Sequence, residues 1–510
     1  MGADGVIRAG SIHVHWIDLC LIVTYLVAMI LFGFFYSRRV KDSADYFLAG
    51  RRLPWWIIGM SIIGSNIGSN DYVGAAGGAY SIGIAQANFE WIGAIPAMVL
   101  ASFLFIPFYW KAGVFSIPEY LGLRYSQTVR VISAVVLSLF SVFIVGVFLY
   151  ATATMLATYI GIGLVTGILI TAIVVGLYTI TGGLAAVAMS DSVQLVIMFA
   201  GAAALAILGV EKAGGPAMFL ERLATEHPDH LRPFLPADHA QFPWPGVILG
   251  LAFVLSPAYW CTNQVILQRT LAARTRWDGQ ASMIFAAFAK TMVPFLIILP
   301  GFVALVLYPG VLERPDAALP WVIREVLPPG LSGLLFVAFI AALQSSVDST
   351  LNSTAVMITR DMVGVLSSSE RSERGELLLG QFVTFLVLAV GVFFAIYIVL
   401  ELEQNEFEGI YSFVQRGLSY FQGPMFALLS FGILTRRTTA SAGLWALVLG
   451  VLLAVLLANV SWPGIGELNM LYVAFYSCVF SVALLFGISR FTKPASRERL
   501  QNLTIHTTDD

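Results

Sequence analysis

The sequence predicts an all-α polytopic membrane protein, and three observations lead to this fold class. The 510 residues are 58% hydrophobic and 11% charged, with a mean hydropathy of +0.84, whereas roughly a quarter of the residues in a soluble domain are charged. The apolar residues lie in runs long enough for the ~20 residues that span a bilayer. These runs do not alternate with a period of two, as the strands of a membrane barrel would.

The apolar runs predict about 13 transmembrane helices. The first run is too long for the apolar core of a signal peptide, and its basic residues follow it, so we expect a retained first helix. The predicted helices are 16–36, 54–80, 84–109, 127–160, 163–181, 186–209, 246–267, 281–308, 331–361, 376–399, 409–434, 441–458 and 470–489.

Lysine and arginine are distributed unevenly between the segments that connect these helices. Of the 28 such residues, 20 fall in alternate segments beginning with residues 38–52, and 6 fall in the intervening segments. Cytoplasmic loops carry the excess of positive charge, so this split predicts an external N-terminus and a cytoplasmic C-terminus. In this count Arg269, Arg274 and Arg276 belong to one cytoplasmic loop.

Composition excludes several classes of function. The formal net charge of −2 gives no sign of a nucleic-acid partner. The three cysteines, Cys20, Cys261 and Cys478, form neither an even set nor a CxxC pair, so we expect no disulfide framework or metal cluster. The sequence also lacks the nucleophile, metal and nucleotide motifs of an enzyme. We therefore expect a non-enzymatic protein whose surroundings are the lipid bilayer of the cell membrane.

Residues 61–71 interrupt the second predicted helix with two glycines, two asparagines and Asp71. In hydrocarbon each unpaired backbone polar group costs several kcal/mol, so an interrupted helix is tolerated only where it lines a cavity. Residues 256–264 interrupt the seventh helix in a similar way. These helices begin two blocks of five, 54–209 and 246–434. Because five is odd, the second block is inverted, and paired interrupted helices in inverted repeats indicate a secondary-transporter site.

The same pattern divides the chain into six parts. The last part is polar, and we expect it to be disordered. The parts are an N-terminal helix and cytoplasmic loop at 1–53, the first inverted repeat at 54–209, an external loop at 210–245, the second inverted repeat at 246–434, two C-terminal helices at 435–490 and a cytoplasmic tail at 491–510.

Eight polar or aromatic side chains within the predicted helices form a candidate solute site. A hydroxyl-rich solute needs carboxylate or amide acceptors, amide or ammonium donors and aromatic faces to pack against. For an isolated asparagine, serine or glutamine the alternative is a hydrogen bond between helices. An ionisable side chain in the membrane is costly and usually functional. The eight are Asn66, Asp71, Glu90, Ser256, Tyr259, Trp260, Lys290 and Gln415.

Six short motifs occur along most of the chain, from about residue 45 to 440. They are Asp45-Tyr46-Phe47-Leu48-Ala49-Gly50-Arg51, Ser65-Asn66-Ile67-Gly68-Ser69, Phe89-Glu90-Trp91, Tyr178-Thr179-Ile180-Thr181-Gly182-Gly183-Leu184-Ala185-Ala186-Val187, Tyr259-Trp260-Cys261-Thr262-Asn263-Gln264 with Gln268-Arg269, and Leu351-Asn352-Ser353-Thr354. In order and spacing they resemble the solute:sodium symporter family, and within it the sodium/glucose and sodium/myo-inositol cotransporters. The resemblance implies a LeuT-like fold of five-plus-five inverted repeats and Na⁺-coupled transport.

The resemblance also implies roles for individual residues. Tyr259 and Trp260 match an aromatic pair that lies beside the sugar in the family. The positions that match sugar-contacting residues are Asn66, Glu90, Lys290 and Gln415.

The sequence departs from the family at three other positions. Asp71 stands where sugar carriers commonly have glutamine or histidine, Ile144 where some have asparagine, and Phe89 where some have tyrosine. An anion at Asp71 favours a polyol or an aminated sugar over an anionic solute, unless Lys290 neutralises it.

The ninth predicted helix carries serines that can bind Na⁺, which takes roughly five or six oxygens from hydroxyls and from the carbonyls of unwound backbone. Ser345 and Ser346 are expected to face the carbonyls of Gly64 and Ile67. The resemblance assigns these groups, with the carbonyl of Ala342, to the shared sodium site of the family. A helical serine can instead bond to a carbonyl one turn earlier.

The resemblance implies a second Na⁺ site at Asp191, Ser345, Asp348 and Ser349, in the manner of family members that move two sodium ions. Asp348 replaces a hydroxyl of the family pattern, so two carboxylates converge. Both can ionise only with a cation between them, so the pair would bind Na⁺ or hold a proton. The alternative is that Asp348 pairs with an arginine such as Arg360.

The sequence therefore predicts a Na⁺-coupled symporter for a sugar or polyol that works by alternating access. Two alternatives remain open. One is a Na⁺ symporter for another small organic solute, such as a sialic acid, a nucleoside or an amino compound. The other is a sugar-gated cation channel or sensor.

Overall fold

The protein is described by a computed structural model that covers residues 15–38, 40–312, 315, 318–367, 372–402, 410–461 and 468–507. The side chains of residues 69–73, 158, 401–402 and 410–413 lie outside this description, so the backbone alone places Asp71, in α4 (Ser69–Ile82). Within the covered ranges the regular structure is helical, apart from two isolated bridges, Leu53 with Ala273 and Leu235 with Pro243.

Ten helices in the covered ranges are long and apolar enough to cross a membrane, and Arg276–Lys290 with Val293–Leu307, bent by 48°, makes an eleventh candidate if the pair counts as one span. The all-α polytopic fold class is confirmed, whereas the count of 13 and the orientation of the termini stay predictions. The ten are Trp16–Ser37, Gly74–Ala112, Gln127–Ala157, Leu164–Lys212, Trp244–Thr262, Leu331–Leu366, Glu373–Leu400, Val414–Leu434, Ala440–Asn459 and Met470–Ser489.

The predicted repeats contain the helices that form the centre of the molecule. The first block holds α3 (Trp55–Asn66), α4, η3 (Glu90–Ala94), α5 (Ile95–Leu100), α6 (Ile106–Ala112), α7 (Ile117–Arg124), α8 (Gln127–Ile160) and α9 (Leu164–Lys212). The second holds η6 (Val247–Leu255), α12 (Ser256–Thr262), α13 (Gln264–Leu271), α14 (Arg276–Lys290), α15 (Val293–Ile297), α16 (Leu299–Leu307), α18 (Leu331–Val356), η8 (Met357–Val363), α20 (Glu373–Leu402) and α21 (Ile410–Leu434).

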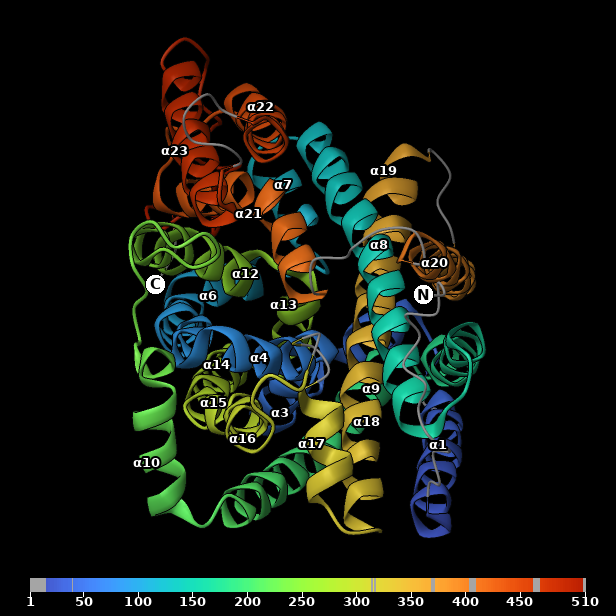
Figure 1. Ribbon diagram of the computed structural model, residues 1–510. Coiled ribbons are helices and arrows are strands. Elements are labelled where there is room, and N and C mark those ends of the chain that lie inside the picture. The colour runs from blue at the N-terminus through green and yellow to red at the C-terminus, as the bar shows by residue number, and fades with distance from the viewer. Residues whose placement is uncertain are drawn as a thin grey trace.

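Outside the two blocks, α1 (Trp16–Ser37) packs against α9 and α18, while α22 (Ala440–Asn459) and α23 (Met470–Ser489) pack against α21. In Figure 1, α18, α20 and α1 lie on one side, the orange and red α21 to α23 lie on the other, and α8 contacts α20 and α18 as well as α21 and α22. Shorter helices connect the spans, namely α2 (Ser43–Leu48), α10 (Pro216–Glu226) and α17 (Ala318–Val326).

The chain breaks between α3 and α4, as the composition predicts. Ile67 leaves the helical region with φ −83° and ψ 76°. Two glycines let this segment approach its neighbours closely. A β-carbon on Gly64 would lie 3.1 Å from the carbonyl oxygen of Asp191, and one on Gly68 would collide with the hydroxyl of Ser346. The break therefore lies directly against α9 and α18.

A second break separates α12 from α13. Asn263 is extended (φ −70°, ψ 119°), and its side chain accepts a hydrogen bond of 2.8 Å from the N–H of Val265, which caps α13. Pro257 lies inside the continuous helical span Trp244–Thr262, just after the π-helical segment η6, and the backbone stays helical there. The interruption predicted at 256–264 is present, but it falls at the asparagine and not at the proline.

The predicted helices 163–181 and 186–209 are two helices that meet at a break at Gly183, and both carry the label α9. Gly183 has φ 57° and ψ −164°, and a β-carbon there would lie 2.6 Å from the carbonyl oxygen of Tyr46 in α2. Only glycine fits such a backbone conformation at so close a contact. The boundary expected from the sequence is therefore present, at Gly183.

Two expectations about the predicted cytoplasmic side are wrong. Arg269 is a buried residue of α13 and not part of a basic loop. Residues 491–507 are packed rather than disordered, with Leu500 and Leu503 buried. The hydroxyl of Tyr120 donates to the carbonyl of Leu503 (2.6 Å), and the N–H of Ile505 donates to the α21 backbone (3.0 Å). A few leucines anchor a segment whose average composition is polar.

Candidate solute and cation site

One cavity lies beside the first break, between α8, α12 and α21. Its volume is about 150 Å³, room for on the order of ten water molecules and so for a small organic solute. Seven of the eight predicted solute residues line it, and the side chain of the eighth, Asp71, lies outside the described part of the chain. The seven are Asn66, Glu90, Ser256, Tyr259, Trp260, Lys290 and Gln415.

A buried ion pair lies at one end of this cavity. Lys290, at the end of α14, donates to the carboxylate of Glu90, at the start of the π-helical segment η3. The exposed fractions are 1% for Lys290 and 6% for Glu90. The ammonium also lies 5.7 Å from the ring centre of Trp260, a cation–π distance. Each charge thus has the opposite charge that burial in a membrane requires.

Asn66, the last residue of α3, reaches across to α12. Its amide N–H donates to the hydroxyl of Tyr259 at 3.2 Å, while its amide oxygen is buried and has no hydrogen-bond partner. Tyr259 and Trp260 contact each other edge to face, with ring centres 5.3 Å apart. A buried acceptor without a donor costs about 1–3 kcal/mol, so a donor from a bound solute would stabilise this site.

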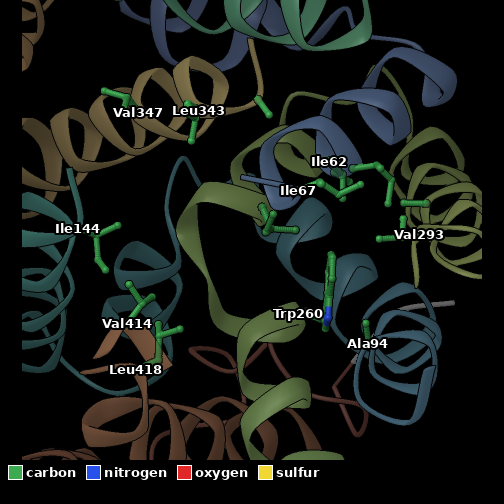
Figure 2. Close-up of a cluster of buried hydrophobic side chains, with 14 of the residues drawn as sticks. Ile62, Ile67, Ala94, Ile144, Trp260, Val293, Leu343, Val347, Val414 and Leu418 are labelled. Atoms are coloured by element: carbon green, nitrogen blue, oxygen red, sulfur yellow. The ribbon is translucent and has the colours of Figure 1, made fainter. Parts of the chain in front are cut away.

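Several apolar side chains line the cavity from α8 and α21. Figure 2 shows Ile144 of α8 with Val414 and Leu418 of α21 on one side of the site and Trp260 on the other. Phe89 also lines the cavity, with its ring centre 5.1 Å from that of Phe242. The site therefore has a polar face and an apolar face.

Ser346 of α18 joins the first break to the predicted sodium site. Its hydroxyl lies 3.5 Å from the carbonyl oxygen of Ser65 and 3.2 Å from that of Ala342. The second contact is the one-turn hydrogen bond expected as the alternative. The predicted ligands Gly64 and Ile67 lie at the end of α3, and the predicted ligands Ala342 and Ser346 lie on α18, which faces it. Carbonyls at the end of a helix have no intrahelical donors, so those at the end of α3 are available to a cation. The hydroxyl of Ser345 instead donates to Asp191.

Asp191 is the centre of a second, fully buried cluster. Its carboxylate accepts hydrogen bonds from Ser61 (2.5 Å), Ser65 (2.9 Å) and Ser345. It also forms an ion pair of 3.2 Å with Arg269 of α13. The predicted second cation site therefore contains a guanidinium group supplied by the chain itself.

Asp348 belongs to the same cluster but has donors of its own. It accepts hydrogen bonds from the hydroxyls of Tyr178 (2.7 Å) and Ser349 (3.0 Å). The alternative pairing with Arg360 is wrong, because Arg360 lies 3.2 Å from Glu376 and stacks on a phenylalanine ring.

The family model of the sodium:solute symporter family matches residues 46–450. The chain belongs to this family. The symporter is 30% identical over 540 residues to sodium/glucose cotransporter 1 of Ovis aries, with 95% of this chain and 80% of that protein covered. It is 31% identical to sodium/glucose cotransporter 4 of Homo sapiens (97% and 78% covered) and 28% identical to human sodium/myo-inositol cotransporter 2 (97% and 79% covered).

Solved structures agree with this assignment at the level of the fold. A Na⁺-coupled sialic acid symporter in a substrate-bound outward-open state superposes with a TM-score of 0.84 at 24% identity, covering 94% of this chain and 99% of that one. Mhp1, a nucleobase-cation-symport-1 family transporter, superposes with a TM-score of 0.57 at 14% identity, covering 91% and 99%. Both have the LeuT fold, so the expected LeuT-like fold of the symporter is confirmed.

Sequence reasoning missed several polar residues of the symporter cavity, among them Ser141, Thr350 and Gln422. Gln422 lines the cavity, is 2% exposed, and has an amide oxygen without a hydrogen-bond partner. It lies seven residues after Gln415, two turns along the same face of α21, so helical spacing was a signal by which it could have been found. A different signal was available for Arg269, because it lies in the Gln268-Arg269 motif that resembles the family.

Proposed function

We propose that the protein couples Na⁺ entry to the uptake of a neutral polyhydroxylated solute, a sugar or polyol, by alternating access. The observation that carries this proposal is that neighbouring residues at the first break contact two different sites. Asn66 contributes to the solute cavity, and the adjoining Ser65 carbonyl faces Ser346. Filling either site would fix the same backbone segment, so the two ligands favour each other.

The charges of the cavity favour a neutral solute. Glu90 and Lys290 are the charged side chains among the described residues that line it, and they neutralise each other. An anionic solute such as a sialic acid would need an unpaired positive charge. Hydroxyl groups, by contrast, can donate to the amide oxygens of Asn66 and Gln422 and accept from Lys290. The names of the sugar and inositol cotransporters similar to this chain support the same solute class.

The driving force follows from the charge of the ion. One charge that crosses ~100 mV contributes about 2.3 kcal/mol, and a tenfold Na⁺ gradient adds about 1.4 kcal/mol. One Na⁺ per solute could therefore concentrate the solute roughly 500-fold, and two could concentrate it on the order of 10⁵-fold. The number of ions therefore decides the accumulation limit.

Uptake into proteoliposomes tests the proposal. Labelled glucose, galactose and myo-inositol are offered under an inward Na⁺ gradient, with equal Na⁺ on both sides as the control. We expect at least one of them to accumulate above equilibrium and to do so only with the gradient. If none accumulates while sialic acid, a nucleoside or an amino compound does, the solute class is wrong. A solute-evoked Na⁺ current without accumulation would identify a channel or sensor instead.

A further inference from the structure

Six basic side chains gather where three membrane-spanning helices end. α21 ends at Leu434, α22 begins at Ala440 and α23 ends at Ser489. The connection between α21 and α22 carries two exposed arginines, and the segment after α23 carries four more exposed basic residues. We call these six residues the basic patch: Arg436, Arg437, Arg490, Lys493, Arg497 and Arg499.

Tertiary contacts hold these two segments side by side. The hydroxyl groups of Thr439 and Thr492 share a hydrogen bond of 2.6 Å, and the N–H of Thr439 donates to the hydroxyl of Ser489 (3.1 Å). The tail then packs back on the same end of the molecule, where Arg499 donates to the carbonyl of Tyr125 (2.8 Å). The basic patch is therefore one surface, although its members come from two parts of the chain.

The basic patch lacks carboxylate partners. No ion pair between described residues includes one of its members, and Glu498 is the one acidic residue in segments 435–439 and 490–507. In the predicted external segments, by contrast, every described arginine lies beside a carboxylate: Arg222 by Glu226 (3.2 Å), Arg232 by Asp229 (3.0 Å) and Arg324 by Glu325 (3.7 Å). An excess of positive charge is usual in cytoplasmic loops, but here the charges are also gathered without counter-charges.

A buried guanidinium group adds a further positive charge to this surface. Arg124 of α7 is 1% exposed and donates to three backbone carbonyls of α21 and of the connection that follows it. They are those of Gly432 (2.7 Å), Thr435 (2.8 Å) and Thr438 (3.1 Å). A carbonyl oxygen satisfies an N–H donor but carries no full negative charge, so the charge of Arg124 is not cancelled. Clustered charge of one sign beside a low-dielectric medium raises the local concentration of counter-ions.

Phe491 indicates what kind of anion the basic patch binds. Its side chain is 86% exposed, and it directly follows Arg490 at the end of α23. An apolar side chain among basic residues at the end of a membrane-spanning helix fits the boundary between lipid headgroups and acyl chains. A soluble anion such as phosphate would leave this ring in water. A phospholipid offers a phosphate to the arginines and an acyl chain to the ring.

We propose that the basic patch binds the headgroups of anionic phospholipids in the leaflet next to the ends of α21 and α23. Basic residues close to an anionic leaflet each add to the attraction. The packed tail holds Arg497 and Arg499 on the same end of the molecule, so the tail contributes to the contact. This inference concerns the lipid surroundings of the protein and does not depend on which solute is transported.

Thermal unfolding of the purified protein in a neutral detergent tests the proposal. Phosphatidylglycerol is the anionic probe, and phosphatidylcholine is the neutral control. We expect phosphatidylglycerol alone to raise the melting temperature, by several degrees, because a ligand that binds the folded state stabilises it. Raising KCl from about 0.05 M to about 0.5 M should remove most of this shift, since salt screens exposed charges.

Two double variants show whether the basic patch is responsible for the shift. Arg436→Gln combined with Lys493→Gln removes one charge from each of its segments, and we expect the shift to fall at least twofold. Arg276→Gln combined with Arg374→Gln removes two exposed charges elsewhere on the predicted cytoplasmic side and should keep the full shift. All four side chains are exposed, so we expect both variants to fold.

The lipid that copurifies with the protein gives a second measurement. After extraction from vesicles of equal phosphatidylglycerol and phosphatidylcholine content, the patch variant should retain less phosphatidylglycerol per protein than the control variant. An equal shift, or equal retention, in the two variants would overturn the proposal. Stabilisation of the wild type by inorganic phosphate as strong as that by phosphatidylglycerol would also overturn it, because it would identify a site for soluble anions.

Discussion

Ser65 and Asn66 are consecutive residues whose side chains belong to different clusters. The hydroxyl of Ser65 donates to Asp191 in the cation cluster, and the amide of Asn66 donates to Tyr259 in the solute cavity. Successive helical residues point about 100° apart, so the last turn of α3 presents one side chain to each cluster, directly before the break at Ile67. The predictions below test each side of that segment.

Ser346→Ala removes the hydroxyl that faces the break. We expect the Na⁺ concentration for half-maximal uptake to rise at least tenfold, because the predicted sodium site loses one of its roughly five or six oxygens. Ser353→Ala is the matched control, since Ser353 is also a buried hydroxyl of α18 bonded to a carbonyl of its own helix. An Na⁺ dependence that is the same in both variants would refute the assignment of the sodium site to Ser346.

Gly68→Ala should disturb the predicted sodium site from the side of the first break, opposite Ser346. The new β-carbon would collide with the hydroxyl of Ser346, so that hydroxyl must move out of its present position. We expect weaker Na⁺ activation and a lower melting temperature. Gly487→Ala in α23 is the control, because its β-carbon meets nothing within 4 Å and a helical Gly→Ala change in open space stabilises by about 0.4–1 kcal/mol. Normal Na⁺ activation in Gly68→Ala would show that this approach is not needed for coupling.

Glu90→Gln should separate stability from transport. The change leaves Lys290 charged and buried without its counter-ion, a loss typically of about 3–5 kcal/mol, so we expect a clear fall in melting temperature and loss of uptake. Adding Lys290→Gln removes the unpaired charge and should restore much of the melting temperature without restoring uptake. Uptake that returns together with stability in the double variant would mean that the pair only supports the fold.

Tyr259→Phe removes the acceptor of the Asn66 amide and leaves the ring. A net hydrogen bond contributes about 0.5–1.5 kcal/mol, so we expect the solute KM to rise roughly 2- to 10-fold with the Na⁺ activation curve unchanged. Tyr476→Phe, at a half-exposed tyrosine of α23, is the control and should leave KM unchanged. A change in Na⁺ activation alone would place Tyr259 on the cation side of the break.

Leu503→Ser should release the packed tail. Leu503 is 5% exposed, and a polar side chain loses the apolar contact that holds the segment beside α7 and α21. We expect trypsin to cut after Arg497 and Arg499 several-fold faster than in the wild type, whereas Na⁺-driven uptake is retained. Thr508→Ser, beyond the described residues, is the control for cleavage in this region. Equal cleavage rates would contradict the packed arrangement.

Much of the cavity could be predicted from single residues. Polar and ionisable side chains inside apolar runs identified seven lining residues, because a membrane tolerates such groups only where they have partners or a function. The break at Ile67 was equally visible, since glycines and asparagines disfavour a continuous helix. The sequence did not indicate which of these residues contact each other. Lys290 and Glu90 are 200 residues apart, and no local pattern in either segment predicts that they form an ion pair.

The sequence by itself determined the fold class, the two interrupted helices and the chemistry of the candidate site, because hydropathy and helix-breaking residues act over short stretches. Only the tertiary structure decided which side chains form ion pairs and hydrogen bonds with each other. It placed Arg269 among Ser61, Ser65 and Asp191 instead of in a basic loop. The physical reason is that a charge inside a membrane is governed by its nearest counter-charge, and that neighbour is set by how distant helices pack.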